Sequence, residues 1–201
     1  GIAKTVAFIF VSPVLGFVVG YLVHKLSHLL TRAAHPRINQ KLRLAQYVTT
    51  AALAFSHGAN DAQKSMGVLT LVLVLGGFIP HFEVPFWVML ACATAITAGI
   101  LSGGWRIVRT LGFAVFKVRP LHALDSQLTS GLVILSASMM GAPVSTSHVV
   151  ATSIMGIGAS ERPRRVHWGK AGEIATTWLI TLPASAAMGA LVLLALRPWV
   201  V

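Results

Sequence analysis

Residues 44–79 read LAQYVTTAALAFSHGANDAQKSMGVLTLVLVLGGFI, a 36-residue segment that is apolar at both ends and polar in its middle. As one straight helix it would run about 54 Å, well beyond the roughly 30 Å hydrocarbon core of a membrane. Its central part, Ser56 to Lys64, therefore predicts an interruption of the helix. Backbone that leaves the helix at this depth is tolerated only where it lines a cavity or is buried in protein.

A second long segment, residues 123–159, is built in the same way. Its interruption is expected at residues 141–148, which read GAPVSTSH. Secondary transporters form their sites for anions and coupling ions from discontinuous helices near the bilayer midplane. We call residues 56–64 the first polar segment and residues 141–148 the second polar segment.

The composition is that of a membrane protein. Of the 201 residues, 55% are hydrophobic and only 10% are charged, whereas a soluble domain carries about 45–50% apolar and about 25% charged residues. This balance excludes a soluble enzyme and a disordered chain. It predicts an all-α polytopic membrane protein in which residues 1–201 form a single transmembrane domain. We expect full spans at about 5–30, 44–79, 86–103 and 171–196, and a helical hairpin at 123–159.

The basic residues predict the orientation. The chain has 16 Lys and Arg residues and 5 Asp and Glu residues. Because the basic residues lie between the apolar segments, membrane topology explains them better than nucleic-acid binding does. The positive-inside rule places loops 31–43, 105–120 and 162–170 in the cytoplasm and the connector 80–85 outside. Segment 123–159 must then enter and leave on one side, as a re-entrant hairpin that turns near Pro143. We therefore expect four crossings plus this hairpin in the cytoplasmic membrane.

Two charged residues lie in the middle of the first long segment. Asp61 and Lys64 are spaced i, i+3, which places them on one helix face where their charges offset each other. Ionisable residues within a membrane are costly and are functional by default. Asp61 and Asn60 offer the oxygen ligands that small cations prefer, and Lys64 suits an oxyanion. The alternative is an ion pair that only holds helices together.

The second polar segment offers hydroxyl groups at an expected helix start. Ser145, Thr146 and Ser147 follow Pro143, and hydroxyls with free backbone amides at the positive end of a helix can bind an anion. Ordinary N-capping of a buried helix explains the same residues equally well. Elsewhere, Gly16 and Gly20 match the small-xxx-small pattern of helix packing.

The sequence leaves one enzyme class open. His57 and Asp61, spaced i, i+4, could join His148 in the metal site of a membrane metalloenzyme. The chain has no His-Glu-x-x-His pair, so this interpretation is the weaker one. Cys92 has no second cysteine to pair with, and we expect it to be a small buried hydrophobic residue.

The two polar segments resemble the two signatures of the inorganic phosphate transporter (PiT) family, in the form found in its carboxy-terminal half. The resemblance rests on residues 57–67, HGANDAQKSMG, and on residues 141–148, and it covers essentially the whole chain. Family members are built from two inverted repeats around one central site. The resemblance implies symport of inorganic phosphate with Na⁺ or H⁺ by alternating access, with no cofactor beyond the coupling cation. It implies phosphate binding by Asn60, Asp61, Gln63, Lys64, Ser145, Thr146 and Ser147, with the cation at Asn60, Asp61, Ser145 and Thr146.

The chain holds one copy of the first signature where the family has two. We therefore expect it to be one half of a transporter, with the amino-terminal half or a second copy as its partner, and the start at Gly1 favours a fragment. A sulfate permease of the same fold and a non-transporting scaffold subunit remain alternatives.

Overall fold

The computed structural model describes residues 2–32, 38–142 and 144–200, and every regular element in these ranges is a helix. The prediction of an all-α protein is confirmed. The chain forms two compact units, residues 1–166 and residues 167–201. The helices are α1 (Ile2–Thr31), α2 (Ile38–Leu75), α3 (Phe86–Arg109), α4 (Pro120–Met139), α5 (Thr146–Glu161) and α6 (Trp168–Val200), with a π-helical turn η1 (Thr110–Val115) and a 3-10 turn η2 (Pro163–Arg165).

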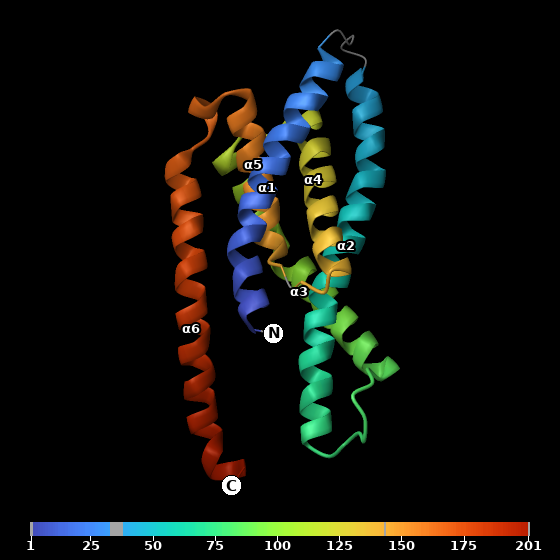
Figure 1. The fold of residues 1–201 in the computed structure, drawn as a ribbon, viewed down its shortest axis with the longest axis vertical. Coiled ribbons are helices and arrows are strands. Elements are labelled where there is room, and N and C mark those ends of the chain that lie inside the picture. The colour runs from blue at the N-terminus through green and yellow to red at the C-terminus, as the bar shows by residue number, and fades with distance from the viewer. Residues whose placement is uncertain (1, 33–37, 143, 201) are drawn as a thin grey trace. The chain divides into compact units, whose positions relative to one another are not determined.

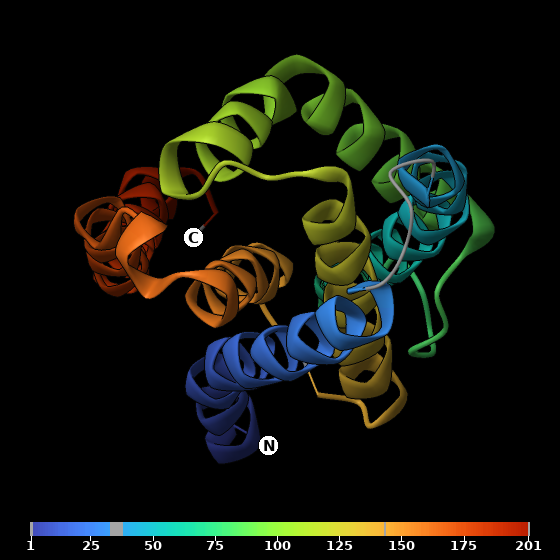
Figure 2. The same cartoon turned by 90° about the horizontal axis from the view of Figure 1, so that it is seen from above.

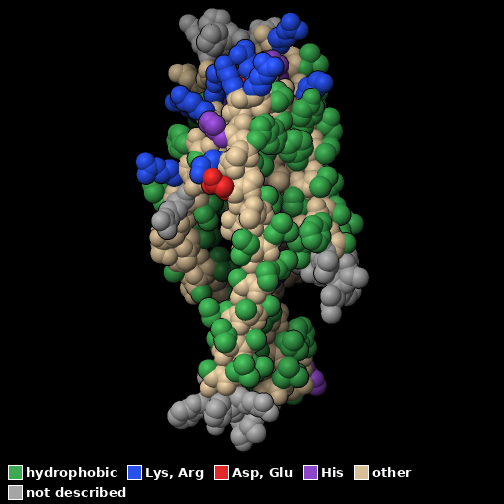
Figure 3. All heavy atoms as spheres, turned by 90° about the vertical axis from the view of Figure 1, so that its left-hand side faces the viewer, with side chains coloured by type: hydrophobic (Ala, Val, Ile, Leu, Met, Phe, Trp, Pro, Cys, Tyr) green, Lys and Arg blue, Asp and Glu red, His purple; other side chains and the backbone are tan. Residues whose placement is uncertain are grey.

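Within the described residues, three helical segments are long and apolar enough to cross a membrane. They are Ala7–Thr31, Phe86–Trp105 and Trp168–Ala195, and they overlap three of the four expected spans. The fourth expected span, 44–79, corresponds to α2 and is not among them. Figure 3 shows hydrophobic side chains spread over much of one face, with Lys and Arg side chains gathered toward one end of the view.

Helix α2 is continuous, so the prediction of a helix broken at residues 56–64 is wrong. It runs for 38 residues from Ile38 to Leu75 without a proline. A single glycine costs a helix only about 1 kcal/mol, and nothing approaches Gly58 within 4 Å of where a Cβ would lie. The Ser56 and Ser65 hydroxyls donate to the carbonyls of Ala52 and Asp61, four residues earlier, and so stay within the helix.

The second long segment folds as two helices joined by a short connection. Helices α4 and α5 run in opposite directions, so residues 120–161 begin and end at the same end of the first unit (Figure 1). The expected turning residue, Pro143, lies outside the described residues. A re-entrant placement of this pair in the membrane stays a prediction, as do the four crossings and the inverted repeat.

Helix α1 packs closely against α5, and α4 and α5 lie between α1 and α3 (Figure 2). A Cβ on Gly16 would lie 2.9 Å from the carbonyl oxygen of Val149, and one on Gly20 would lie 2.7 Å from that of Ser153. On the facing helix, a Cβ on Gly156 would overlap the Phe17 carbonyl oxygen. The small-residue pattern at Gly16 and Gly20 is thus confirmed as a packing surface.

The basic loop expected at 105–120 is mostly helical. Helix α3 continues to Arg109, and η1 extends to Val115, so extended backbone begins at Phe116. This stretch holds a single glycine, Gly112, and no proline before Pro120, so a helix is acceptable here, and charge alone does not end one.

Candidate functional site

The site is centred on the Asp61 carboxylate, in the middle of α2. Its Oδ1 atom lies 3.2 Å from Lys64 Nζ and 3.2 Å from Asn60 Nδ2, both of which donate to it. Its Oδ2 atom lies 3.5 Å from His57 Nε2. Because α2 is unbroken, His57, Asn60 and Lys64 lie within one helical turn of Asp61. The predicted face shared by Asp61 and Lys64 is therefore present.

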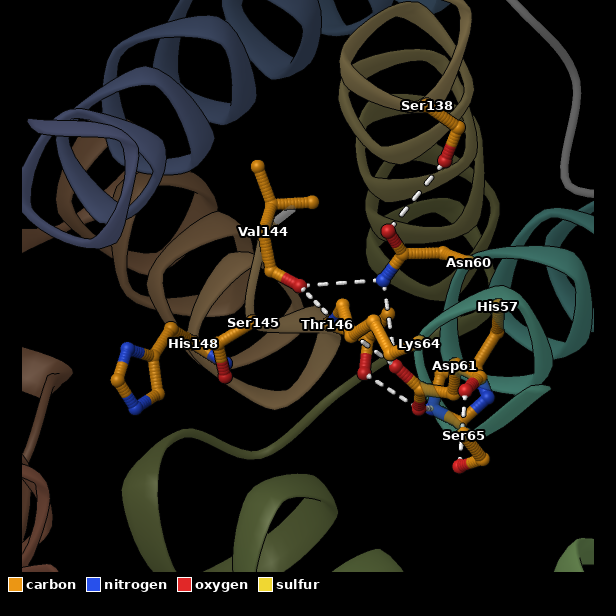
Figure 4. Close-up of polar contacts among 10 residues, drawn as sticks. All are labelled: His57, Asn60, Asp61, Lys64, Ser65, Ser138, Val144, Ser145, Thr146 and His148. Atoms are coloured by element: carbon orange, nitrogen blue, oxygen red, sulfur yellow. Dashed lines mark hydrogen bonds and ion pairs between the residues drawn. The ribbon is translucent and has the colours of Figure 1, made fainter. Parts of the chain in front are cut away.

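The start of α5 meets this face from 85 residues further along the chain. Thr146, the first residue of α5, donates from Oγ1 to Asp61 Oδ2 at 3.3 Å (Figure 4). Just before it, the Val144 carbonyl accepts from Lys64 Nζ at 2.5 Å and from Asn60 Nδ2 at 3.1 Å. The two polar segments thus form one continuous hydrogen-bond network.

Ser145 takes the N-cap position of α5. Its Oγ accepts from the backbone N–H of His148 at 3.5 Å, which is the capping arrangement that the sequence left open beside anion binding. Further along, Thr152 Oγ1 donates to the His148 carbonyl at 2.8 Å. Capping holds the first turn of α5 in place, and Ser145 and Ser147 both line a pocket on this side.

A third element, the end of α4, completes the network. Ser138 donates to Asn60 Oδ1 at 3.4 Å. Asn60 is only 3% exposed, and its amide bridges Ser138 of α4 and the Val144 carbonyl before α5. The side chain of Asn60 therefore joins α2 to both helices of the α4–α5 pair.

All seven residues predicted for the substrate site line two pockets that share Lys64. One pocket is lined by Asn60, Gln63, Lys64, Ser138, Gly141 and Ala142. The other is lined by Ile9, Asp61, Lys64, Val144, Ser145, Thr146 and Ser147. The first pocket presents amides and an ammonium group, and the second adds a carboxylate and three hydroxyls.

Sequence reasoning missed two members of this network. Ser138 was overlooked because it is one of several serines in an apolar run, although it lies three residues before Gly141 and so at the depth of the second polar segment. Val144 acts through its backbone carbonyl, which no side-chain pattern reveals. The sequence sign for a turn here was Gly141 itself, which adopts a φ of +61° in the structure, a conformation that favours glycine.

The arrangement carries both signs of charge in one place. Asp61 and Lys64 are 32% and 39% exposed, so both reach the pocket surface. The ammonium group and the positive end of α5 suit an oxyanion, and the carboxylate suits a cation. The contacts to Asp61 measure 3.2–3.5 Å, longer than the roughly 2.7–2.9 Å of strong charge-assisted bonds. An incoming cation can therefore compete for the carboxylate oxygens.

The metalloenzyme alternative finds no support in this geometry. His57 approaches Asp61, but the His148 ring points away from both (Figure 4). In the part of the chain that the structure describes, no three His, Cys, Asp or Glu side chains are grouped so that they could hold a metal ion.

Comparisons with known proteins show the family and the fold of this chain. Residues 27–189 match the model of the phosphate transporter family. The chain is 38% identical over 193 residues to a probable low-affinity inorganic phosphate transporter of Bacillus subtilis, and 39% identical to one of Rhizobium meliloti. Each match covers 95% of this chain and 58% of the relative, so the chain spans a little over half the length of these proteins.

A solved structure has the same fold. The sodium-dependent phosphate transporter superposes with a TM-score of 0.80 at 21% identity, over 98% of this chain and 66% of the other. The helical fold and the apolar helices define a multi-pass membrane protein. The chain belongs to the phosphate transporter family. Its relatives are named as transporters and not as enzymes.

Proposed function

We propose that this chain contributes one of two inverted repeats to a symporter that carries inorganic phosphate across the cytoplasmic membrane with Na⁺ or H⁺, by alternating access. One observation supports it most. The Asp61 carboxylate, the Lys64 ammonium group and the first turn of α5 come together from segments 85 residues apart. A carboxylate beside an anion cradle is what cation-coupled anion transport requires.

In this proposal, phosphate lies between Lys64 and the first turn of α5. The ammonium group, the hydroxyls of Thr146 and Ser147 and the backbone amides of that turn offset its charge. Gln63 and Asn60 supply amide donors from α2. The cation binds at Asp61 with oxygen ligands from Asn60, Ser145 and Thr146, in place of the Lys64 contact. The second repeat, from the rest of the protein or a second copy, supplies the other wall of the site.

The relatives support phosphate as the substrate, and the structural neighbour is described as sodium-dependent. Sodium is therefore the first coupling ion to test. Sulfate is also a tetrahedral oxyanion, but it has no proton to donate at neutral pH. A carboxylate acceptor in the site thus favours phosphate, since a hydrogen-bonding site discriminates against a partner that lacks the matching group.

The test is uptake of labelled phosphate by the full-length protein in proteoliposomes, with sulfate as competitor and with Na⁺ replaced by K⁺ at fixed pH. Asp61→Asn should abolish uptake at matched membrane abundance. The matched control is Glu173→Gln on α6, which removes a carboxylate that pairs with Lys170 at 2.7 Å but is 65% exposed. Uptake by Asp61→Asn at the rate of wild type would remove Asp61 from the mechanism. Uptake of sulfate and not of phosphate would mean that sulfate is the substrate.

A further inference from the structure

A second buried group of ionisable side chains lies near the opposite end of α4 from the candidate site. His24 of α1 and Asp125 of α4 are 3% and 0% exposed, and His24 Nδ1 lies 2.6 Å from Asp125 Oδ2. Asp125 precedes Ser138 by 13 residues on α4, a distance of about 20 Å along the helix axis. This pair is therefore separate from the network around Asp61.

The neighbouring charged groups are already engaged with one another. His122 Nδ1 accepts from the backbone N–H of Arg119 at 3.1 Å, so the ring proton of neutral His122 is on Nε2, which lies 3.3 Å from Glu161 Oε2. Glu161 also lies 3.6 Å from Arg119. Because both of its nitrogens are used, His122 has no free lone pair for another proton.

His24 is different. Its Nδ1–H donates to Asp125 Oδ2, and its Nε2 lone pair can then accept a proton. The His122 ring packs edge-on against it, with centroids 4.9 Å apart, and the exposed His28 ring stacks at 6.2 Å. Of the titratable groups that face His24 from α1, α4 and α5, Asp125 is the one in direct hydrogen-bond contact.

Burial makes the charge of this pair costly. With a neutral imidazole the pair carries one negative charge, and Asp125 Oδ1 is buried with no hydrogen-bond partner among the described residues. A buried charge without a partner is strongly unfavourable. One proton on His24 Nε2 cancels that charge and turns the contact into a charge-assisted hydrogen bond between two helices.

The pair also lies at the end of a close contact between α1 and α5. Ser12, Gly16, Gly20 and His24 are spaced four residues apart on α1, and all four are buried. The glycines bring α1 against the α5 backbone. His24 is the last of these four residues, and it bonds to Asp125 of α4. The strength of this bond therefore affects how tightly α1 is held against the α4–α5 pair.

We propose that His24 and Asp125 form a proton-binding site, separate from the phosphate site, whose occupancy by one proton tightens the packing of α1 against α4. The proton adds to His24 Nε2 from water, and no other bond breaks. Its effect on phosphate uptake rests on the proposed function, whereas proton binding by the pair does not.

The first test measures phosphate uptake by the full-length protein between about pH 5 and pH 8, the range in which histidine changes charge. His24→Asn keeps a donor near Asp125 but cannot take up a proton. The same substitution at the exposed His28, one turn further along α1, is the matched control. Phosphate itself changes charge over this range, but equally for wild type and both variants. Its effect therefore cancels when the uptake by each variant is divided by that of wild type at the same pH. The ratio of His24→Asn to wild type should change several-fold across the range, and that of His28→Asn should stay constant. A constant ratio for His24→Asn would overturn the proposal.

The second test does not require transport. Nitrogen-15 NMR can follow each histidine ring signal of the purified full-length protein over this pH range. One of the titrating signals should disappear in His24→Asn and remain in His28→Asn. If His24→Asn gives too little folded protein, Asp125→Asn should move that titration, whereas Glu173→Gln should not. A His24 ring that keeps one protonation state throughout would overturn the proposal. A ring that titrates in a protein that transports no phosphate would support the proton site and contradict the proposed function.

Discussion

Thr146, the first residue of α5, donates its hydroxyl to Asp61 Oδ2 at 3.3 Å, across 85 positions of the chain. This bond joins the middle of a long continuous helix to the beginning of a short one. It brings the positive end of α5 and the side-chain carboxylate within reach of the same small ions.

Thr146→Val removes this hydroxyl while keeping the shape of the side chain. We expect the apparent affinity for the coupling cation to fall several-fold, since one net hydrogen bond contributes about 0.5–1.5 kcal/mol. The measurement is phosphate uptake as a function of Na⁺ concentration. Thr176→Val on α6, whose hydroxyl donates only to the Gly172 carbonyl, is the control. If phosphate uptake depends on Na⁺ concentration in the same way in Thr146→Val and wild type, the Thr146 hydroxyl does not bind the cation and serves only to hold the helices together.

Lys64→Gln should weaken phosphate binding because it removes the ammonium group that the two pockets share. The matched control is Lys170→Gln, since Lys170 also pairs with a carboxylate three residues away but is 53% exposed on α6. The concentration of phosphate that gives half-maximal uptake should rise for Lys64→Gln and stay at the wild-type value for Lys170→Gln. Equal values for the two variants would place phosphate elsewhere.

Gly156→Ala should destabilise the protein because its Cβ would overlap the Phe17 carbonyl oxygen where α1 meets α5. Overpacking of this kind costs about 1–3 kcal/mol. Thermal unfolding of the purified full-length protein should show a clear fall in the midpoint. A midpoint equal to that of wild type would mean that α1 and α5 are further apart than described.

Gly58→Ala tests whether α2 is continuous. A Cβ at Gly58 meets nothing within 4 Å, and alanine is favoured over glycine in a helix by up to about 1 kcal/mol. We expect a midpoint equal to or above that of wild type, in the same unfolding experiment. A lowered midpoint would show that the helix is irregular at Gly58, or that another part of the full-length protein packs there.

The sequence was sufficient to predict the class of fold and seven of the residues that line the two pockets, because apolar length and rare intramembrane charges are strong signals. It was misleading about α2. One glycine among polar residues looks like a break, but the hydroxyls of Ser56 and Ser65 bond back into the helix and the chain has no proline there. The carbonyl of Val144 and the pairing of His24 with Asp125 depend on tertiary packing, which local patterns do not encode.

The continuity of α2 has a mechanical consequence. Arg43 precedes Asp61 by 18 residues, about 27 Å of unbroken helix, so the segment between them acts as a stiff rod. A tilt or turn imposed at the end that carries Arg43 reaches the carboxylate undiminished, without a hinge to absorb it. Relative displacement then occurs where the rod contacts its neighbouring helices, and the bond between Asp61 and Thr146 is one such contact.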